Sequence, residues 1–364
     1  MVIPLFGSGN ARAGLRALEL SVAARREKYS DFGESTNPKV GLAWTPVDAL
    51  RLRGTWSTSF KAPGLGDLDE ALNFSTIQFA PDPLQPSNAP SAVLVWLGKN
   101  RDLQEETATS WTAGFDVSAP WLHGLTLGLT YFDIEYQDRI QDAPFTFTWL
   151  TDPQFAGLVV RAPTTAQRDE VCTRSQFGGL PQDCRNAPIA AIVDLRANNT
   201  AVVENRGVDL LAAWDTRVGA HQLSFGLNAT YLIDFRQAQV SSAPRVELVS
   251  TQSNPIDLRL RGSLGWRRGG FAAAAFINHT DSYRDTISEP DRRIGSWSTL
   301  DINLSYATGA ARSSFFGDTL ISLAVQNVFD EDPPFFNNPT GVGYDRENAD
   351  LLGRFASLQI SKRW

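Results

Sequence analysis

The sequence predicts an all-β fold, an antiparallel transmembrane β-barrel segment of about twelve strands, on three observations. Apolar and polar residues alternate along many short segments, so that each predicted strand has one apolar face. Short turns and long loops follow one another in strict alternation. Aromatic residues stand close to the short turns. This combination is typical of outer-membrane barrels, which have short periplasmic turns, long external loops and aromatic girdles.

The alternation is clear in Leu50, Leu52 and Trp56, which share one face, whereas Arg51 and Arg53 share the other. Such a pattern gives a strand two chemically different faces because successive side chains point in opposite directions. The same pattern recurs along the chain, and the predicted strands contain residues 18–24, 40–44, 50–56, 111–117, 125–131, 208–214, 223–231, 256–266, 271–277, 300–306, 321–325 and 356–364.

Two connections, residues 61–102 and 139–199, are much longer than the others. Connections of this length are uncommon in a compact domain unless they carry function or have structure of their own. In a barrel they would be extracellular loops.

The aromatic residues near the short turns predict a girdle at the lower membrane interface. The predicted girdle consists of Trp44, Trp121, Trp214, Trp266, Tyr306 and Trp364. Trp56, Tyr131 and Tyr231 lie farther from these turns, where an upper girdle is expected. The stretch from Trp121 to Tyr131 has the roughly ten residues that a tilted strand needs to cross an apolar band of about 25 Å.

Composition excludes several classes of protein. The chain has 364 residues, of which 42% are hydrophobic and 20% charged, so disorder is not expected. Its net charge of −7 argues against nucleic acid as a partner, because phosphate binding needs a basic surface. No apolar run is long enough for a membrane-spanning helix. A soluble β-sandwich or propeller remains the alternative, with the apolar face in a core and the charged face in water.

Several motifs, in this order, resemble those of the TonB-dependent receptors of Gram-negative outer membranes. They are N-P-K-V-G-L-A-W-T-P at residues 37–46, R-G-T-W-S-T-S-F-K-A-P-G-L-G-D-L at 53–68, N-R-D-L-Q-E-E-T-A-T-S-W-T-A-G-F at 100–115, Y-F-D-I-E-Y-Q-D-R-I at 131–140, N-R-G-V-D-L at 205–210 and V-Q-N-V-F-D at 325–330. The resemblance covers nearly the whole chain. One departure is Arg101, which stands where the family often has proline.

The resemblance implies a barrel of about 22 strands that encloses an N-terminal plug, whose TonB box couples it to the inner-membrane TonB complex. The chain shows neither plug nor TonB box, so we expect residues 1–364 to be the C-terminal portion of such a barrel. The implied partners are the lipid bilayer of the outer membrane, the missing plug and barrel strands, the TonB complex through that plug, and a small-molecule ligand.

Residues capable of chemistry are few. His123, His221 and His279 are far apart and have no partner at metal-ligand spacing, so we expect no metal, cofactor or catalytic site. Cys172 and Cys184, the only cysteines, lie in one long loop, where a disulfide is expected in an exported protein; two buried free thiols are the alternative.

The expected function is therefore uptake of a scarce extracellular solute, such as a siderophore, cobalamin or an oligosaccharide. Asp133 and Glu135 share a strand face and are interpreted as a solvated extension beyond the membrane. Loop aromatics could stack on a ligand or pack on one another; they are Phe74, Phe79, Trp96, Phe145, Phe147, Trp149, Phe335 and Phe336. The alternatives are a self-contained outer-membrane β-barrel enzyme and a receptor fragment that does not transport. The substrate-binding residues are not predicted.

Overall fold

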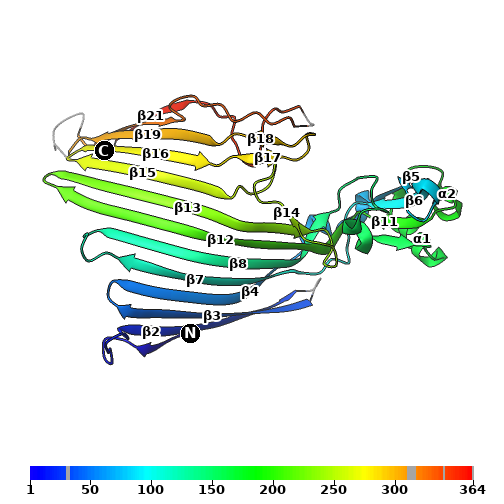
Figure 1. The fold of residues 1–364 in the computed structure, drawn as a ribbon, viewed down its shortest axis with the longest axis horizontal. Helices are drawn as coiled ribbons and strands as arrows, with labels where there is room; N and C mark the ends of the chain where they lie inside the picture. Colours follow the sequence, from blue (N-terminus) through cyan, green and yellow to red (C-terminus); the bar gives the residue numbers. More distant parts are fainter. Residues whose placement is uncertain (30–32, 310–316, 339–340, 363–364) are drawn as a thin grey trace.

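A computed structural model describes residues 1–29, 33–309, 317–338 and 341–362. One antiparallel sheet of fourteen strands dominates it (Figure 1). Thirteen strands follow one another across the sheet, and β14 (Val246–Glu247) pairs with β13 alone. In sheet order they are β1 (Val2–Phe6), β2 (Ala17–Tyr29), β3 (Gly33–Val47), β4 (Leu50–Lys61), β7 (Glu106–Ser118), β8 (Leu125–Asp142), β12 (Ala197–Val218), β13 (His221–Ala238), β15 (Leu258–Arg268), β16 (Phe271–Thr280), β19 (Trp297–Ala307), β20 (Thr319–Gln326) and β21 (Phe355–Lys362).

The prediction of about twelve strands missed β1 and the two-residue β14. The sequence of β1, V-I-P-L-F, is a short apolar run with a central proline and no alternation. Proline is tolerated on a strand whose N–H side is not paired, and β1 lies at the end of the sheet order. Periodicity alone therefore gives no signal for this strand.

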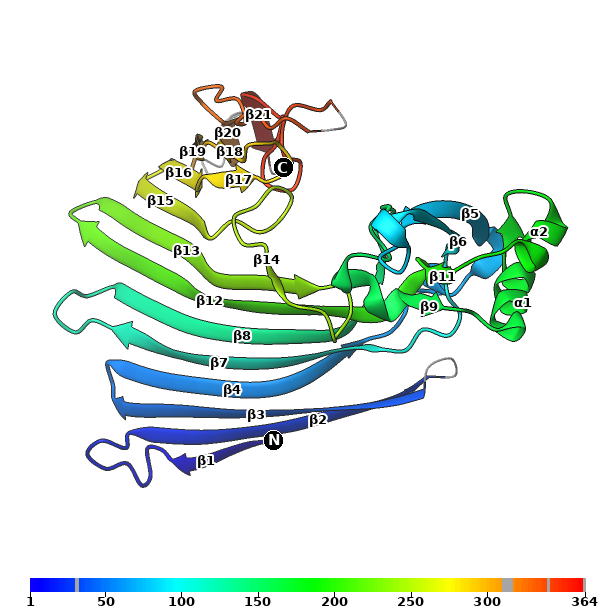
Figure 2. The same ribbon diagram turned by 45° about the vertical axis from the view of Figure 1, so that its right-hand side comes forward.

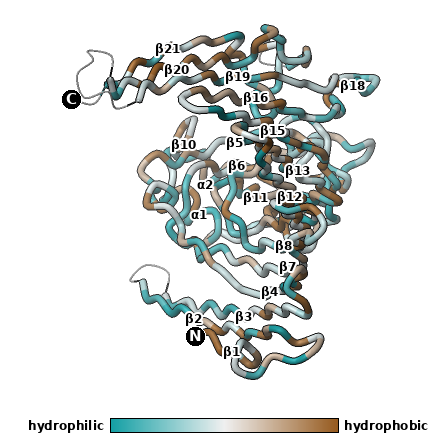
Figure 3. The backbone as a smooth tube through the Cα atoms, turned by 90° about the vertical axis from the view of Figure 1, so that its left-hand side faces the viewer, coloured by the Kyte–Doolittle hydropathy of each residue, from teal (hydrophilic) through white to brown (hydrophobic). Residues whose placement is uncertain are grey.

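The sheet is curved, and within the described chain its two outermost strands, β1 and β21, are not paired with each other (Figures 1 and 2). The turns between β3 and β4, β7 and β8, β12 and β13, and β15 and β16 lie at one end of the strands, and the two longest connections lie at the other (Figure 1). Seen along the long axis, the strands follow an arc (Figure 3). The sheet thus has the shape of part of a barrel wall.

Several strands are longer than a membrane crossing requires. β12 has 22 residues, and β8 and β13 have 18 each. At roughly 3.3 Å per residue β12 extends about 70 Å, whereas a crossing strand needs only about 9–11 residues. The strands therefore continue well beyond an apolar band, toward the long connections.

The two longest connections fold together into one body, the loop module, which we define as residues 62–105 and 143–196. It contains a five-stranded sheet in the order β10-β5-β6-β11-β9. Its elements are η1 (Leu65–Asp67), η2 (Glu70–Leu72), β5 (Phe74–Pro81), η3 (Pro86–Asn88), β6 (Pro90–Leu97), η4 (Pro153–Leu158), β9 (Val159–Arg161), α1 (Thr165–Arg174), β10 (Gln176–Phe177), α2 (Pro181–Asn186) and β11 (Ala191–Asp194). Figure 3 shows the module on the concave side of the arc.

Local sequence explains where α1 begins. The Thr164 side chain accepts a hydrogen bond from the Gln167 backbone, and the Gln167 side chain accepts one from the Thr164 backbone. This reciprocal capping box satisfies two helix N–H groups that would otherwise lack partners. No helix among the described residues is both long and apolar enough to cross a membrane.

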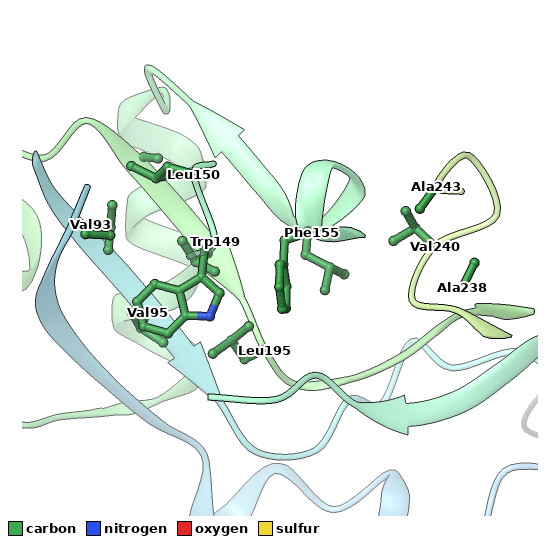
Figure 4. Packing of buried hydrophobic residues seen from close by; sticks show 13 residues of the cluster. Val93, Val95, Trp149, Leu150, Phe155, Leu195, Ala238, Val240 and Ala243 are labelled. Carbon is green, nitrogen blue, oxygen red and sulfur yellow. The ribbon is translucent and has the colours of Figure 1, made fainter. Parts of the chain in front are cut away.

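The best-buried core lies mainly in the loop module, and Ala238, Val240 and Ala243, from the end of β13 and the segment after it, also pack in it (Figure 4). Val93 and Val95 on one face of β6 pack in the cluster that contains Trp149, which is 1% exposed. Leu94 and Trp96 on the other face pack in a second cluster. Since β6 is covered on both faces, its continuous apolar sequence is that of a strand buried on both sides.

Candidate functional site

Over the part of the strands nearest the short turns, one face of the large sheet is almost entirely apolar. Cross-strand pairing places Leu52, Phe115, Leu129, Leu210, Ala229 and Leu260 in one continuous row. Many apolar side chains of this face are exposed; Leu358 and Ile360 are each 66% exposed. An apolar surface of this extent is far larger than the patches that soluble monomers expose to water.

Three of the predicted girdle tryptophans use the indole N–H in the same way. Trp44 donates to Gly14 O at 2.8 Å, and Trp214 donates to His123 O at 3.3 Å. Trp266 donates to Nδ1 of His221 at 2.9 Å. Each acceptor lies in or beside a neighbouring short turn. The polar edge of each indole is therefore satisfied at the turn end, which is the arrangement that suits a membrane–water interface.

Two further predicted girdle residues, Tyr306 and Trp121, lie at the same end of the sheet. Tyr306 packs against Phe271 on the neighbouring strand, with ring centroids 4.4 Å apart. Trp121 lies in the turn between β7 and β8 and is 80% exposed. Trp364 lies outside the described residues.

A second aromatic row lies farther along the strands. Trp56 and Trp111 are paired across β4 and β7, with ring centroids 6.1 Å apart. Tyr231, on β13, is 51% exposed. The Tyr131 hydroxyl lies 3.4 Å from an oxygen of Asp133, which follows it on the same face of β8.

Beyond this row the same face becomes charged. Asp133 pairs across the strands with Arg206, and Glu135 pairs with Glu204. Arg206 also forms an ion pair of 2.7 Å with Asp234. This charged surface lies on the part of the strands that extends past the second aromatic row, as expected for a solvated extension.

The opposite face of the sheet carries charged and polar side chains in mid-strand. Arg53 donates to Asp116 at 3.1 Å and to the Thr130 hydroxyl at 2.6 Å. Farther along, the Thr230 hydroxyl donates to Asp209 at 2.6 Å. These side chains line a hollow of about 480 Å³, which also contains Arg259, Arg261 and Asn278. Charges in mid-strand with such partners require water or another polar surface over this face.

A charged clamp joins the two halves of the loop module. Arg174 donates to both carboxylate oxygens of Glu70 and to Asp102 at 2.8 Å. Arg196 lies over the ring of Trp96, with its guanidinium carbon 3.3 Å from the ring centroid. The contact between Arg174 and Glu70 connects residues 104 positions apart in sequence.

The clamp also sets the ionisation of Glu70. Burial alone would raise the pKa of Glu70, but hydrogen bonds from Arg174 and Arg101 outweigh burial and lower that pKa. Arg101, which departs from the family pattern, lies 3.6 Å from Glu70 and so contributes to the same clamp.

A disulfide joins the two helices of the module. Cys172 on α1 and Cys184 on α2 are bonded, with their Cα atoms 5.9 Å apart. Arg168 reinforces the connection by donating to the Cys184 carbonyl at 3.1 Å and to the Ala187 carbonyl at 2.5 Å.

The loop aromatics divide into two groups. Trp96, Trp149 and Phe336 are buried, and these three pack in cores. The exposed group comprises Phe74, Phe79, Phe145, Phe147 and Phe335. Phe145 and Phe147 pack edge-on and tilted, respectively, against Trp149, so their exposed rings rest on the module core. Packing thus accounts for several of these side chains.

Two of the three histidines have a side chain as hydrogen-bond partner. His221 accepts from Trp266, and His279 lies 2.7 Å from the Ser298 hydroxyl. Within the described ranges, no three His, Cys, Asp or Glu side chains are grouped so that they could hold a metal ion.

Sequence reasoning missed the loop module as a folded unit. Its signal was present in two apolar runs, V-L-V-W at residues 93–96 and A-I-V at 191–193, which form the central parallel pair β6 and β11. Runs of this kind, bounded by turn residues, predict strands buried on both faces. The pairing of two strands from different loops has no local signal.

A curved antiparallel sheet with one apolar face, one polar face and long connections at one end is part of the wall of a membrane β-barrel. A family model, TonB dependent receptor-like, beta-barrel, matches residues 4–328. The chain belongs to this family, whose members are transporters of the outer membrane and not enzymes; it is an outer-membrane protein.

Solved structures agree with this assignment. The chain is similar to the siderophore receptor PirA from Acinetobacter baumannii, with 16% identity and a TM-score of 0.60 over 94% of this chain and 43% of that one. It is also similar to the ferric enterobactin receptor PfeA from Pseudomonas aeruginosa, a Q482A mutant in complex with enterobactin, with 16% identity and a TM-score of 0.61 over 94% and 42%. The chain thus spans less than half the length of these receptors. No curated protein matches the chain.

Proposed function

We propose that the chain forms part of the barrel of a TonB-dependent receptor that takes up a scarce extracellular solute, with a siderophore as the favoured class. The observation that carries this proposal is the family match over residues 4–328, together with the similarity to siderophore receptors. Cobalamin and oligosaccharides are the other solute classes considered. The self-contained barrel enzyme is not favoured, because the family consists of transporters.

The proposed barrel is larger than the described sheet. β1 and β21 each carry a row of backbone groups at the edge of the sheet, and unpaired backbone groups are costly in lipid. We propose that further strands pair with both edges, giving a closed barrel of about 22 strands around a plug that contacts the TonB complex. The coverage of 42–43% of the solved receptors supports a segment of this size.

Two features of the membrane arrangement belong to the proposal. The apolar face contacts lipid, and Trp44, Trp121, Trp214, Trp266, Tyr306 and Trp364 form the periplasmic girdle. The second aromatic row lies at the outer interface, so the loop module is extracellular. In that oxidising compartment the Cys172–Cys184 bond persists and staples the module.

Uptake of radiolabelled iron tests the function. Cells that express the chain from its native gene, in a strain without other siderophore receptors, would be given a panel of ferric siderophores and, in parallel, labelled cobalamin and oligosaccharides. We expect accumulation of label from at least one, and loss of accumulation when TonB is deleted. Accumulation that is independent of TonB, or none from any siderophore, cobalamin or oligosaccharide, would contradict the proposal and favour a fragment that does not transport.

A further inference from the structure

A small hairpin at the long-connection end of the sheet presents an unusual charge arrangement. β17 (Tyr283–Asp285) and β18 (Arg292–Ile294) follow β16 in the chain, before β19, and pair with each other antiparallel (Figure 1). Arg284 lies directly opposite Arg293 across the hairpin. Like charges in this position repel each other and destabilise a strand pair.

The rest of the hairpin is held firmly, so the two arginines cannot simply turn away with the backbone. Tyr283 and Ile294 are 4% and 2% exposed and pack with Ile256 and Phe336. The Arg284 N–H donates to Ser250 O at 3.0 Å, and the Arg284 carbonyl accepts from Gln252 N at 2.9 Å. One face of the hairpin is thus core, whereas the other exposes Arg284 and Arg293.

A cleft of about 370 Å³ lies beside this pair. Its lining includes Ser250, Ser282, Arg284, Arg292 and Arg293, and the Arg293 side chain donates to the Ser282 hydroxyl at 2.7 Å. Three arginines and two serines therefore line one small space. Such groups are the usual ligands of phosphate and carboxylate oxygens.

The neighbouring acids neutralise the arginines only in part: Asp285 attracts Arg292, but among the described residues no acid forms an ion pair with Arg284 or Arg293. Asp285 is 1% exposed, and its oxygens accept from the Ile287 and Ser288 backbone and from the Ser288 hydroxyl at 2.6 Å. Asp291 lines the cleft, yet in the described part of the chain no carboxylate oxygen lies within ion-pair distance of Arg284, Arg292 or Arg293. Asp285 and Asp291 leave a net positive charge at this cleft.

We propose that the cleft between β17, β18 and residues 250–252 is a binding site for a soluble oxyanion, a phosphate or carboxylate group, with Arg284 and Arg293 as its principal ligands. The bound anion relieves the repulsion between the two guanidinium groups. The site does not depend on the transport function proposed above, since it requires only the geometry of this hairpin.

Calorimetric titration of the purified protein in detergent with inorganic pyrophosphate and with citrate tests the site. We expect at least one of these anions to bind, and Arg284→Gln to weaken its binding about 10-fold or more, since hydrogen bonds to charged groups are worth about 1.5–3 kcal/mol. The control is Arg185→Gln, because Arg185 is an exposed arginine that already pairs with Asp169 at 2.9 Å. The Arg185→Gln variant should bind the anion with the same affinity as the wild type.

Thermal unfolding separates binding from a structural role. Without anion, Arg284→Gln should unfold at the wild-type midpoint or above it, because one of two repelling charges is gone. If Arg284→Gln does not fold, Arg284→Lys keeps the charge but loses the planar fork, and its affinity should still fall. Absence of anion binding by the wild type, or equal weakening by Arg284→Gln and Arg185→Gln, would overturn the proposal. So would binding of lipopolysaccharide vesicles with no binding of either soluble anion.

Discussion

The large sheet and the loop module place the same kinds of side chain in opposite surroundings. In the module, Val93 and Val95 are 0% exposed and Trp149 is 1% exposed. In the sheet, Leu358 and Ile360 on β21 are each 66% exposed, although every residue of this strand is paired with β20. The module follows the rule for a protein in water, whereas the apolar face of the sheet is complementary to lipid.

The difference teaches that exposure has to be interpreted with the solvent in mind. In the proposed arrangement, an exposed leucine of the module would be in water, whereas one on the apolar face of the sheet would contact acyl chains. Since the module lies beyond the second aromatic row, the proposed arrangement takes the chain from one solvent to the other along continuous strands such as β8 and β12. Each region can be perturbed separately.

The largest expected effect comes from the module core. Trp149→Ala should destabilise the module by about 3–5 kcal/mol, because it removes a fully buried aromatic side chain. Hydrogen exchange should accelerate in residues 62–105 and 143–196 together, since both contribute to one core, while β15 and β16 stay protected. The control Phe147→Ala, which truncates a half-exposed ring, should change exchange little. Acceleration in only one of the two segments would show that they fold separately.

The disulfide is expected to rank next. Cys172→Ser with Cys184→Ser should cost the module about 3 kcal/mol, from the loop entropy that a bridge of this separation removes. Thiol alkylation without reductant measures the bond itself, and the wild type should remain unlabelled until it is reduced. Two thiols that react readily in the exported wild-type protein would contradict the disulfide.

A comparable cost is expected when a charge is placed on the apolar face of the sheet. Two adjacent leucines of β12, one on each face, test this. Leu210→Arg should cost about 2–4 kcal/mol, because it places a charge among acyl chains. Leu211→Arg, one residue along on the polar face of β12, should cost much less, although Leu211 is the more exposed of the two at 51% against 36%. Urea unfolding from lipid vesicles compares them. Equal costs would show that the two faces do not meet different solvents.

The smallest effect is a response of the clamp to acid. The pKa of Glu70 is lowered in the folded state, so its contribution to stability is present above the ordinary value of 4.5 and is lost as the pH falls through the folded value. Hydrogen exchange, corrected for intrinsic rates, should show the module loosening between neutral pH and pH 3 while the sheet does not. Glu70→Gln should show a weaker pH response. An unchanged response would assign the acid sensitivity to other groups.

The two regions also differ in how far the sequence predicts them. Alternation places Leu50, Leu52 and Trp56 on one face and Arg51 and Arg53 on the other, and the sheet pairs them accordingly. This works because pairing in a hairpin is local and the period of two is strict. The five-residue β1 was not predicted, because the residues around Pro4 do not alternate between apolar and polar.

The module was predictable only as two long insertions. Its central pair, β6 and β11, joins residues about a hundred positions apart and is parallel, so no turn residue marks it. The Glu70 clamp and the Arg284 and Arg293 pair likewise arise from tertiary placement, and neither has a local motif. The disulfide was the exception: the sequence predicts it because two cysteines lie in one loop of an exported protein and each has no other cysteine to pair with.

Spin labelling along β12 tests the central claim, that the two faces of this sheet meet different solvents, most directly. Single nitroxides at positions 208 to 213, in protein reconstituted into lipid vesicles, would be scored for collision with oxygen, which is enriched in lipid, and with a water-soluble nickel complex. We expect oxygen to dominate at 208, 210 and 212 and nickel at 209, 211 and 213, with a period of two. Nickel access at all six positions, or no alternation, would contradict a membrane barrel wall.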